Sequence, residues 1–516
     1  MVARTINCKS FGPFVLLLPL FSGCVVGPVF KDPVVDTPKS YRTQVAPVGA
    51  VPEKAMPEKA VTDLSRWKLA ADPEALSLST GKIPAEDLLA EPLRDETLPD
   101  QASVSDLKWW KLFEDPLLYS LVKTALDNNR DLKIAVSRIE QARATVGIRQ
   151  ADQYPRIDVD AGVVKGNFSG GSRSKDTSST AYLSAPLNWE IDFWGKFKRS
   201  TEAAQAELLA SEYGFRTVQL TLVSDVVSNY YQLLDFHRRL NISRNTLKSR
   251  TESLRIIQQR FDKGIISELD VNQSEIQKEI AAAAIPLYER TISKVENNLS
   301  ILLGRLPGAI KTPKYLSGTV QPPEIPVGLP SDILERRPDV VRAKYIVKAQ
   351  TENIGVAEAL RFPAISLTAS LGVASTELGS MTIDGGVWSV GGRLLGPLFD
   401  FNKNKRRVEV QEQRTQQSLY EYENTVLTAF REVEDALVEI NTYRKELAAI
   451  SRQQKAAKNA NRLSKERYDK GVSSYLEVLD TERTLFSSEL QQSELQQQYV
   501  NSYVNLYKSL GGGWVM

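Results

Sequence analysis

Hydrophobic and polar residues alternate strictly in several short segments of the chain. From Ile365 to Val373, every second residue is apolar and the residues between are Ser, Thr or Gly. The same alternation runs over residues 157–163 and 183–191. Segments of about ten residues with one apolar and one polar face are typical of strands in membrane barrels. We therefore expect two strands in each half of the chain, four in all, with loops at 166–179 and 375–385.

A long helical segment follows each pair of strands. No proline lies between Pro186 and Pro286 or after Pro397, and no glycine lies between Gly396 and Gly471. An uninterrupted helix of about 65 residues would reach roughly 100 Å. In the second half, apolar residues recur with the heptad spacing of a coiled-coil seam. These residues are Val426, Phe430, Val433, Leu437, Ile440 and Leu447.

Glycine separates each long helix from a second helix that is predicted to run back beside it. Gly264 and Gly471 supply the two breaks, so each half is expected to contain a helical hairpin. A shorter, alanine-rich helix opens each half and stops before a proline, which disfavours helical backbone in the preceding residue. The shorter helices are predicted at 118–153 and 339–360, and the returning helices at 268–303 and 475–510.

The two halves are copies of one structural unit. The segment from Arg260 to Gly264 (RFDKG) returns 207 residues later as RYDKG, and Asp192-Phe193 returns 208 residues later as Asp400-Phe401. A constant register over such a distance indicates an internal repeat. We divide the chain into a first copy at 106–308, a linker at 309–329 and a second copy at 330–516. The predicted fold class is α+β, with a long coiled coil joined to a sheet.

The N-terminus has the features of an exported, lipid-anchored protein. Arg4 and Lys9 precede a short apolar run, as in a secretory signal peptide, here residues 1–23. Phe21-Ser22-Gly23-Cys24 resembles a bacterial lipobox, which makes Cys24 the expected site of the lipid. Cys8 is the only other cysteine and leaves with the signal. Prolines recur through 24–105, so we expect an extended linker there rather than long helices.

The number of predicted strands requires association between chains. Open sheet edges are not tolerated in hydrocarbon, and the smallest membrane barrels use about eight strands. Four strands from one chain cannot close such a barrel, so the chain is expected to oligomerise. Dimers, trimers and tetramers would provide about 8, 12 and 16 strands, and this reasoning does not choose among them.

The composition argues against several functional classes. The formal net charge is +2, and no region carries the basic stripe that binds nucleic acid. The only histidine, His237, belongs to no Cys/His cluster that would suggest a metal site. We therefore expect neither an enzyme nor a cofactor.

Four short motifs occur in order along the chain. WWKLFEDP begins at Trp109, DFWG at Asp192, RYDKG at Arg467 and LGGGW at Leu510. In these motifs and in its duplication, the chain resembles the TolC-like outer-membrane efflux proteins, specifically the lipoprotein branch that serves resistance-nodulation-division pumps. The resemblance implies a homotrimer in the outer membrane of a Gram-negative bacterium. It also implies a 12-strand β-barrel completed by oligomerisation, with a helical tunnel across the periplasm.

The resemblance also implies partners and a working site. The expected partners are a periplasmic adaptor protein and an inner-membrane resistance-nodulation-division transporter. The hairpin tips are expected to form the adaptor-docking site and the closed entrance. The tip residues are Gly264, Ile265, Ser267, Gly471, Val472, Ser473 and Ser474.

The periplasmic gate is placed on the returning helix of the second copy. The matching residues are Leu476, Asp480 and Arg483, whose spacing puts them on one helix face. A ring of Leu476 would close the tunnel by bulk, and pairs of Asp480 and Arg483, within or between protomers, by charge and size. The competing interpretation is an exposed helix pair that stabilises by a few tenths of a kcal/mol.

Two other functional classes stay open from the sequence. The chain could be an outer-membrane duct for type I protein secretion, which uses the same architecture. A periplasmic adaptor lipoprotein also has a lipid anchor and a helical hairpin, although duplicated hairpins and four alternating strands argue against it. The exported substrate is not encoded in any motif that we recognise.

Overall fold

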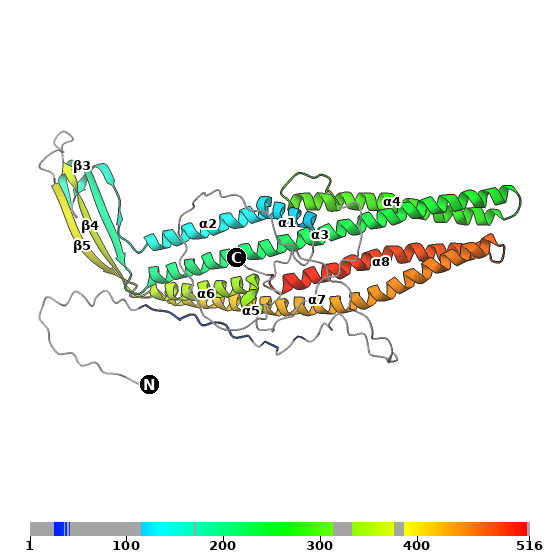
Figure 1. Ribbon diagram of the computed structural model, residues 1–516. Helices are drawn as coiled ribbons and strands as arrows, with labels where there is room; N and C mark the ends of the chain where they lie inside the picture. Colours follow the sequence, from blue (N-terminus) through cyan, green and yellow to red (C-terminus); the bar gives the residue numbers. More distant parts are fainter. Residues whose placement is uncertain are drawn as a thin grey trace, which may run out of the picture.

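The computed structural model describes residues 25–35, 37–38, 41, 115–169, 172–312, 333–375 and 386–512, without the side chains of 167–178. Cys24, residues 42–105 and most of the linker at 309–329 lie outside the described residues. The molecule is elongated, with a sheet at one end and long helices running side by side to the other end (Figure 1).

One antiparallel sheet contains all the described strands. Its strands are β1 (Arg156–Ile157), β2 (Asp160–Ser169), β3 (Ser172–Ile191), β4 (Ala364–Ser375) and β5 (Gly386–Leu395). Both β1 and β2 pair with β3, which pairs with β4, which pairs with β5. Because β1 and β2 lie along the same neighbour, they act as one interrupted strand. The sheet therefore contains the four expected strands.

The register places the alternating apolar residues on one face of the sheet. Directly opposed residues in neighbouring antiparallel strands project to the same side. The apolar rows are Leu183–Val373, Ala185–Leu371–Trp388, Leu187–Ala369–Val390 and Ile191–Ile365–Leu394. Trp388 and Val390 are 77% and 76% exposed. The sheet thus presents an uncovered apolar face, as the alternation predicted.

The prediction of a loop at 166–179 is wrong. β2 and β3 continue through this segment, with Lys165 opposite Ser179 and Gly166 opposite Ser178. A ladder of backbone hydrogen bonds needs no apolar side chains, so a Ser-, Gly- and Thr-rich segment can extend a hairpin. Residues 376–385 of the other expected loop lie outside the described part of the chain.

Two long hairpins form the body of the molecule. The first consists of α3 (Lys196–Asp262) and α4 (Glu268–Leu302), and the second of α7 (Lys403–Asp469) and α8 (Tyr475–Ser509). Both outgoing helices have 67 residues and both returning helices have 35. At 1.5 Å per residue, 67 residues reach about 100 Å. The predicted long helices and their turns are confirmed, with Pro286 accommodated inside α4.

The short helix expected at 118–153 is two helices. α1 (Pro116–Asn128) and α2 (Arg130–Ala151) meet at Asn129, whose backbone is not helical. The Asn129 side chain accepts hydrogen bonds from the N–H groups of Asp131 and Leu132 and so caps α2. Its amide also donates to the Leu302 carbonyl oxygen at 3.0 Å, at the end of α4. In the second copy, α5 (Ile333–Arg336) precedes α6 (Pro338–Ala359).

Two large hydrophobic clusters hold most of the helices together. The larger cluster joins α1, α2, α3, α4 and part of α8. The other contains the heptad residues of α7 from Val426 to Ile440, and Val426, Val433 and Ile440 are completely buried in it. They pack with residues of α6 and α8, including Val340 and Leu506. The predicted seam therefore holds one protomer together.

The N-terminal segment begins against the first copy and then packs along the second copy. The Val26 N–H donates to the Trp194 carbonyl oxygen at 3.2 Å, next to the base of the sheet. Asp32 pairs with Lys344 of α6 at 3.0 Å, and Tyr41 is buried in the cluster around α7. The chain therefore leaves the sheet end and follows α6. In the described part of the chain, no helix is long and apolar enough to cross a membrane.

Candidate functional site at the hairpin tips

The two hairpins turn by the same local structure. Gly264 and Gly471 have φ angles of 71° and 74°, in the left-handed region that favours glycine. The N–H of Gly264 donates to the Phe261 carbonyl oxygen at 2.7 Å, and that of Gly471 to the Tyr468 carbonyl oxygen at 2.9 Å. Such bonds satisfy the last carbonyls of a helix and end it. Sequence and structure agree that these glycines mark the tips.

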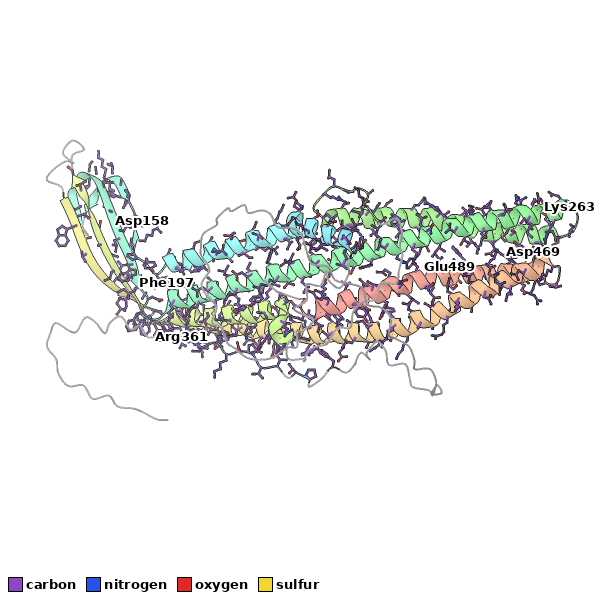
Figure 2. All side chains as sticks on the ribbon, viewed as in Figure 1. Asp158, Phe197, Lys263, Arg361, Asp469 and Glu489 are labelled. Carbon is purple, nitrogen blue, oxygen red and sulfur yellow. The ribbon has the colours of Figure 1, made fainter. Side chains whose placement is uncertain are left out.

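The tips lie together at the end farthest from the sheet. Figure 2 labels Lys263 of the first tip and Asp469 of the second tip there. Arg260 and Asp469 form an ion pair of 3.4 Å between the two hairpins. Ile265 and Val472 follow the glycines and are 66% and 63% exposed. Ser267 and Ser474 stand before the first residues of α4 and α8 as their N-caps. Exposed aliphatic residues on a tight turn form a small apolar surface at each tip.

A polar contact and a small core join the hairpins just behind the tips. The Tyr475 hydroxyl of α8 donates to Ser274 Oγ of α4 at 3.0 Å. Burial raises the pKa of Tyr475 to about 12, so this phenol keeps its proton at neutral pH. Ile257 of α3 is buried beside Tyr475, together with Val478 and Leu479. This cluster holds α8 against the first hairpin.

Arg250 adds a second connection from α3. One of its guanidinium nitrogens donates to the Gln277 carbonyl oxygen at 2.5 Å. Its guanidinium carbon lies 5.0 Å from the centre of the Phe486 ring. Burial lowers the pKa of Arg250, opposed by the charge of Glu482. A buried cation thus spans α4 and α8 near the tips.

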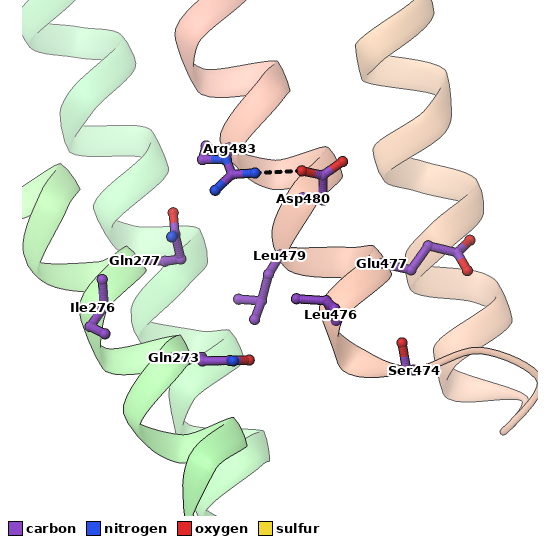
Figure 3. A pocket seen from close by; sticks show the side chains of 9 residues that line it. All are labelled: Gln273, Ile276, Gln277, Ser474, Leu476, Glu477, Leu479, Asp480 and Arg483. Carbon is purple, nitrogen blue, oxygen red and sulfur yellow. Dashed lines mark hydrogen bonds and ion pairs between the residues drawn. The ribbon is translucent and has the colours of Figure 1, made fainter.

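An open groove of about 650 Å³ lies between α4 and α8 (Figure 3). Leu476, Asp480 and Arg483 line one side of it, as their helical spacing predicted. Arg483 Nη2 lies 2.6 Å from Asp480 Oδ1, so the two residues pair within one helix. Their side chains are 68% and 63% exposed, and Leu476 is 62% exposed. All three face away from the core of the protomer.

The opposite wall of the groove had not been assigned to the gate. Gln273, Ile276 and Gln277 of α4 line it. In the 207-residue repeat, Gln273 and Ile276 correspond to Asp480 and Arg483. The duplication therefore carried the signal that these residues share a site. The structure shows an uncharged wall on the first copy facing a charged wall on the second.

A buried polar network links the hairpins farther from the tips. Asp235 of α3 pairs with Arg239 at 2.7 Å and accepts a hydrogen bond from Ser493 of α8 at 2.5 Å. Burial raises the pKa of Asp235, and the bonds from Arg239 and Ser493 oppose that rise. Within the described residues, no group of three or more His, Cys, Asp or Glu side chains could hold a metal ion.

Comparison with known proteins places the chain in a family. The sequence profile of the family described as "Outer membrane efflux protein" matches residues 121–305 and 329–512. The "Probable outer membrane lipoprotein SilC" of Salmonella typhimurium is 33% identical over 424 residues, 82% of this chain and 91% of that protein. The "Solvent efflux pump outer membrane protein SrpC" of Pseudomonas putida is 36% identical over 430 residues, 80% of this chain and 90% of that protein.

A solved structure gives the same result for the fold. A membrane protein from Pseudomonas aeruginosa superposes with a TM-score of 0.75 at 33% sequence identity. The match covers 83% of this chain and 99% of that one. The family profile matches both halves of the chain, and the solved structure shares its fold. The chain belongs to the outer membrane efflux protein family.

Proposed function

We propose that the protein is the outer-membrane channel of a tripartite efflux pump, a passive duct that carries small molecules across the periplasm and the outer membrane. The observation that carries this proposal is the sheet. Its exposed apolar face suits hydrocarbon, and helices of about 100 Å project from one of its ends. The family membership supports the same function.

The duct is a trimer whose barrel has four strands from each chain. The sheet is open at β5 on one side and at β1 and β2 on the other. Unpaired strand edges are not tolerated in a bilayer, so these edges pair between protomers. Because each chain has two hairpins, the trimer arranges six hairpins around the tunnel. The equal lengths of α3 and α7, and of α4 and α8, support this arrangement.

Reconstitution tests the duct directly. The purified full-length protein is expected to migrate as a trimer in a mild detergent gel and to become monomeric on heating. It is also expected to fractionate with the outer membrane and to conduct ions in planar bilayers. Recovery in the inner-membrane fraction, or a stable monomer without conductance, contradicts the proposal and favours an adaptor.

The gate of this duct is the exposed face formed by Leu476, Asp480 and Arg483. In a trimer, the three copies of α8 bring this face toward the threefold axis at the periplasmic end. Both side chains of this pair are more than 60% exposed, and no ion pair joins either of them to another residue of the described chain. A solvated pair stabilises a helix only slightly, which leaves its charge available to the tunnel.

Cross-linking tests the position of the gate. In a Cys24→Ser background, Asp480→Cys is expected to be joined between protomers by a short bismaleimide in the closed trimer. Arg452→Cys, on the exposed surface of α7, serves as the matched control and is expected to remain uncross-linked. Equal cross-linking at the two positions contradicts the location of the gate without affecting the duct.

The remaining parts of the site follow from the same arrangement. Cys24 is the lipid anchor, and Val26, two residues later, is hydrogen-bonded at the base of the sheet. The tips around Gly264 and Gly471 dock the periplasmic adaptor, which delivers substrate from the inner-membrane transporter. Mass spectrometry of the mature N-terminus checks the anchor, because acylation at Cys24 adds the mass of its fatty acids.

A further inference from the structure

An exposed patch of apolar and basic residues lies where the second copy passes from sheet to helix. We name it the junction patch. Its apolar part is strongly exposed, with Leu398, Phe399 and Phe401 at 102%, 76% and 83%. Its basic part is formed by Arg361, Lys403 and Lys405, which are also exposed. Figure 2 labels Arg361 at the base of the sheet.

Local contacts bring these residues together. The Asn404 side-chain amide of α7 donates to the Leu360 carbonyl oxygen at 2.9 Å, which places Arg361 beside the start of α7. A Cβ on Gly396 would lie 2.7 Å from Pro363. The segment before β4 and the segment after β5 are therefore in close contact. The rings of Phe399 and Phe401 lie edge to face with centroids 4.4 Å apart.

The backbone of the turn is strained where it projects these aromatic residues. Phe401 and Asn402 have φ angles of 51° and 64°, and they are the only described non-glycine residues with positive φ. Such a conformation is a genuine outlier for a bulky residue. If packing within the chain determined this strained turn, Phe401 would be buried. Phe401 is exposed instead.

The basic residues have little intramolecular role. No ion pair joins Arg361, Lys403 or Lys405 to an acid of the described chain. Lysine at the start of a helix is disfavoured by the helix dipole, and α7 has no acid in its first turn. Helix stability therefore does not account for these cations.

Two basic residues near the start of α3, in the first copy, are neutralised. Lys196, at the start of α3, pairs with Glu190 at 2.5 Å. Arg199 is buried and hydrogen-bonds to Glu352 of α6. Between residues 396 and 408, by contrast, Asp400 is the only acid, and its carboxylate accepts a hydrogen bond from the Asn404 N–H. Lys403 and Lys405 therefore lie at a helix start where the nearest preceding acid in sequence, Asp400, is hydrogen-bonded to the backbone and pairs with neither lysine.

We propose that the junction patch binds an anionic phospholipid of the periplasmic leaflet. The proposal rests on the proposed function, which places the sheet in the outer membrane. The last apolar row of the sheet ends at Leu394, so the patch lies where hydrocarbon gives way to headgroups. Lys403, Lys405 and Arg361 contact the phosphodiester, and one acyl chain lies along Leu398 and Phe399. Charge and apolar surface match the two ends of such a lipid.

Lipid titration of the full-length protein tests this proposal. Phosphatidylglycerol or phosphatidylcholine is added to the protein in a non-ionic detergent, and bound lipids are counted by native mass spectrometry. Phosphatidylglycerol is expected to bind more tightly. The triple variant Arg361→Gln, Lys403→Gln, Lys405→Gln is expected to weaken it by about fivefold per charge removed. Phe399→Ser is expected to weaken both lipids.

A matched control removes the same charge elsewhere. Lys445→Gln, Arg452→Gln and Lys455→Gln lie exposed on the same helix, far from the sheet, and are expected to bind lipid as the wild type does. Equal affinity for the two lipids, or an unchanged affinity in the patch variant, overturns the proposal. The planar-bilayer conductance of the patch variant is expected to match that of the wild type. A negative lipid-binding result therefore does not contradict the proposed channel function. A wild type without conductance instead refutes the duct.

Discussion

Single glycines set the geometry of the tips. Apart from the adjoining residues, no atom of the described chain lies within 4 Å of a Cβ placed on Gly264 or Gly471, so space does not require glycine there. Their positive φ does, because an L-residue in the left-handed region costs about 1–2 kcal/mol. The turn residues are thus defined by backbone conformation rather than by packing.

Gly471→Ala is expected to loosen the second tip. The strain of about 1–2 kcal/mol should raise the rate of amide hydrogen exchange in the tip peptide by roughly 5–30-fold. Gly147→Ala is the matched control, since Gly147 lies exposed inside α2 with a free space around it. That change should instead stabilise α2 by about 0.5–1 kcal/mol. Unchanged exchange at the tip of Gly471→Ala would contradict the role of φ.

The residues of the site were only partly predictable. The face of Leu476, Asp480 and Arg483 follows from helical spacing, which fixes the direction of side chains along a helix. Gln273 and Ile276 were left out of the gate because they do not repeat the charges of Asp480 and Arg483, although the repeat places them at equivalent positions. The sequence did not decide whether Asp480 and Arg483 pair within one protomer or between protomers. In the single chain, Arg483 pairs with Asp480, three residues earlier on the same helix.

Helices and strands were predictable where one physical factor dominates. The absence of proline and glycine gave the length of α7, and alternation gave the two faces of β4. The break at Asn129 was missed because the apolar pattern continues across it. The non-helical backbone of Asn129 ends α1, and its side chain caps α2. The extension of β2 and β3 was missed because backbone pairing leaves no signature in Ser- and Gly-rich residues.

The buried network of Asp235 provides a test at the scale of the two hairpins. Asp235→Ala leaves the mostly buried Arg239 without its 2.7 Å partner, and Arg239 keeps only a 3.4 Å contact to Glu494. The expected cost is about 3–5 kcal/mol, observed as a lower thermal midpoint by circular dichroism. The double variant Asp235→Leu, Arg239→Met removes both charges and should recover most of that loss. A double variant as unstable as the single one would show that packing, not charge, holds these helices.

The whole molecule is incomplete as a single chain. Its sheet has two open edges and an apolar face that nothing in the described protomer covers. Its tips carry a charged pair that points away from its own core. In the proposed trimer, one assembly would both close the barrel and bring the tips together, with the membrane at one end and the adaptor at the other.

A charge on the apolar face is expected to prevent that assembly. Val390→Lys places an ammonium among the hydrocarbon-facing rows and should cost about 2–4 kcal/mol near the middle of the membrane. Ser389→Lys, on the opposite face beside Ser370, is the adjacent control and should be tolerated. The yield of heat-modifiable trimer in outer-membrane fractions measures the difference. Equal yields would place the apolar face away from lipid.

Single-channel conductance in planar bilayers tests the central claim, that the tips close an outer-membrane duct. The variant Asp480→Ala, Arg483→Ala is compared with the wild type and with Glu140→Ala, Arg143→Ala, an exposed pair of the same spacing on α2. The gate variant is expected to conduct more than the wild type, and the control pair to conduct equally. A gate variant that remains trimeric with wild-type conductance would contradict the account.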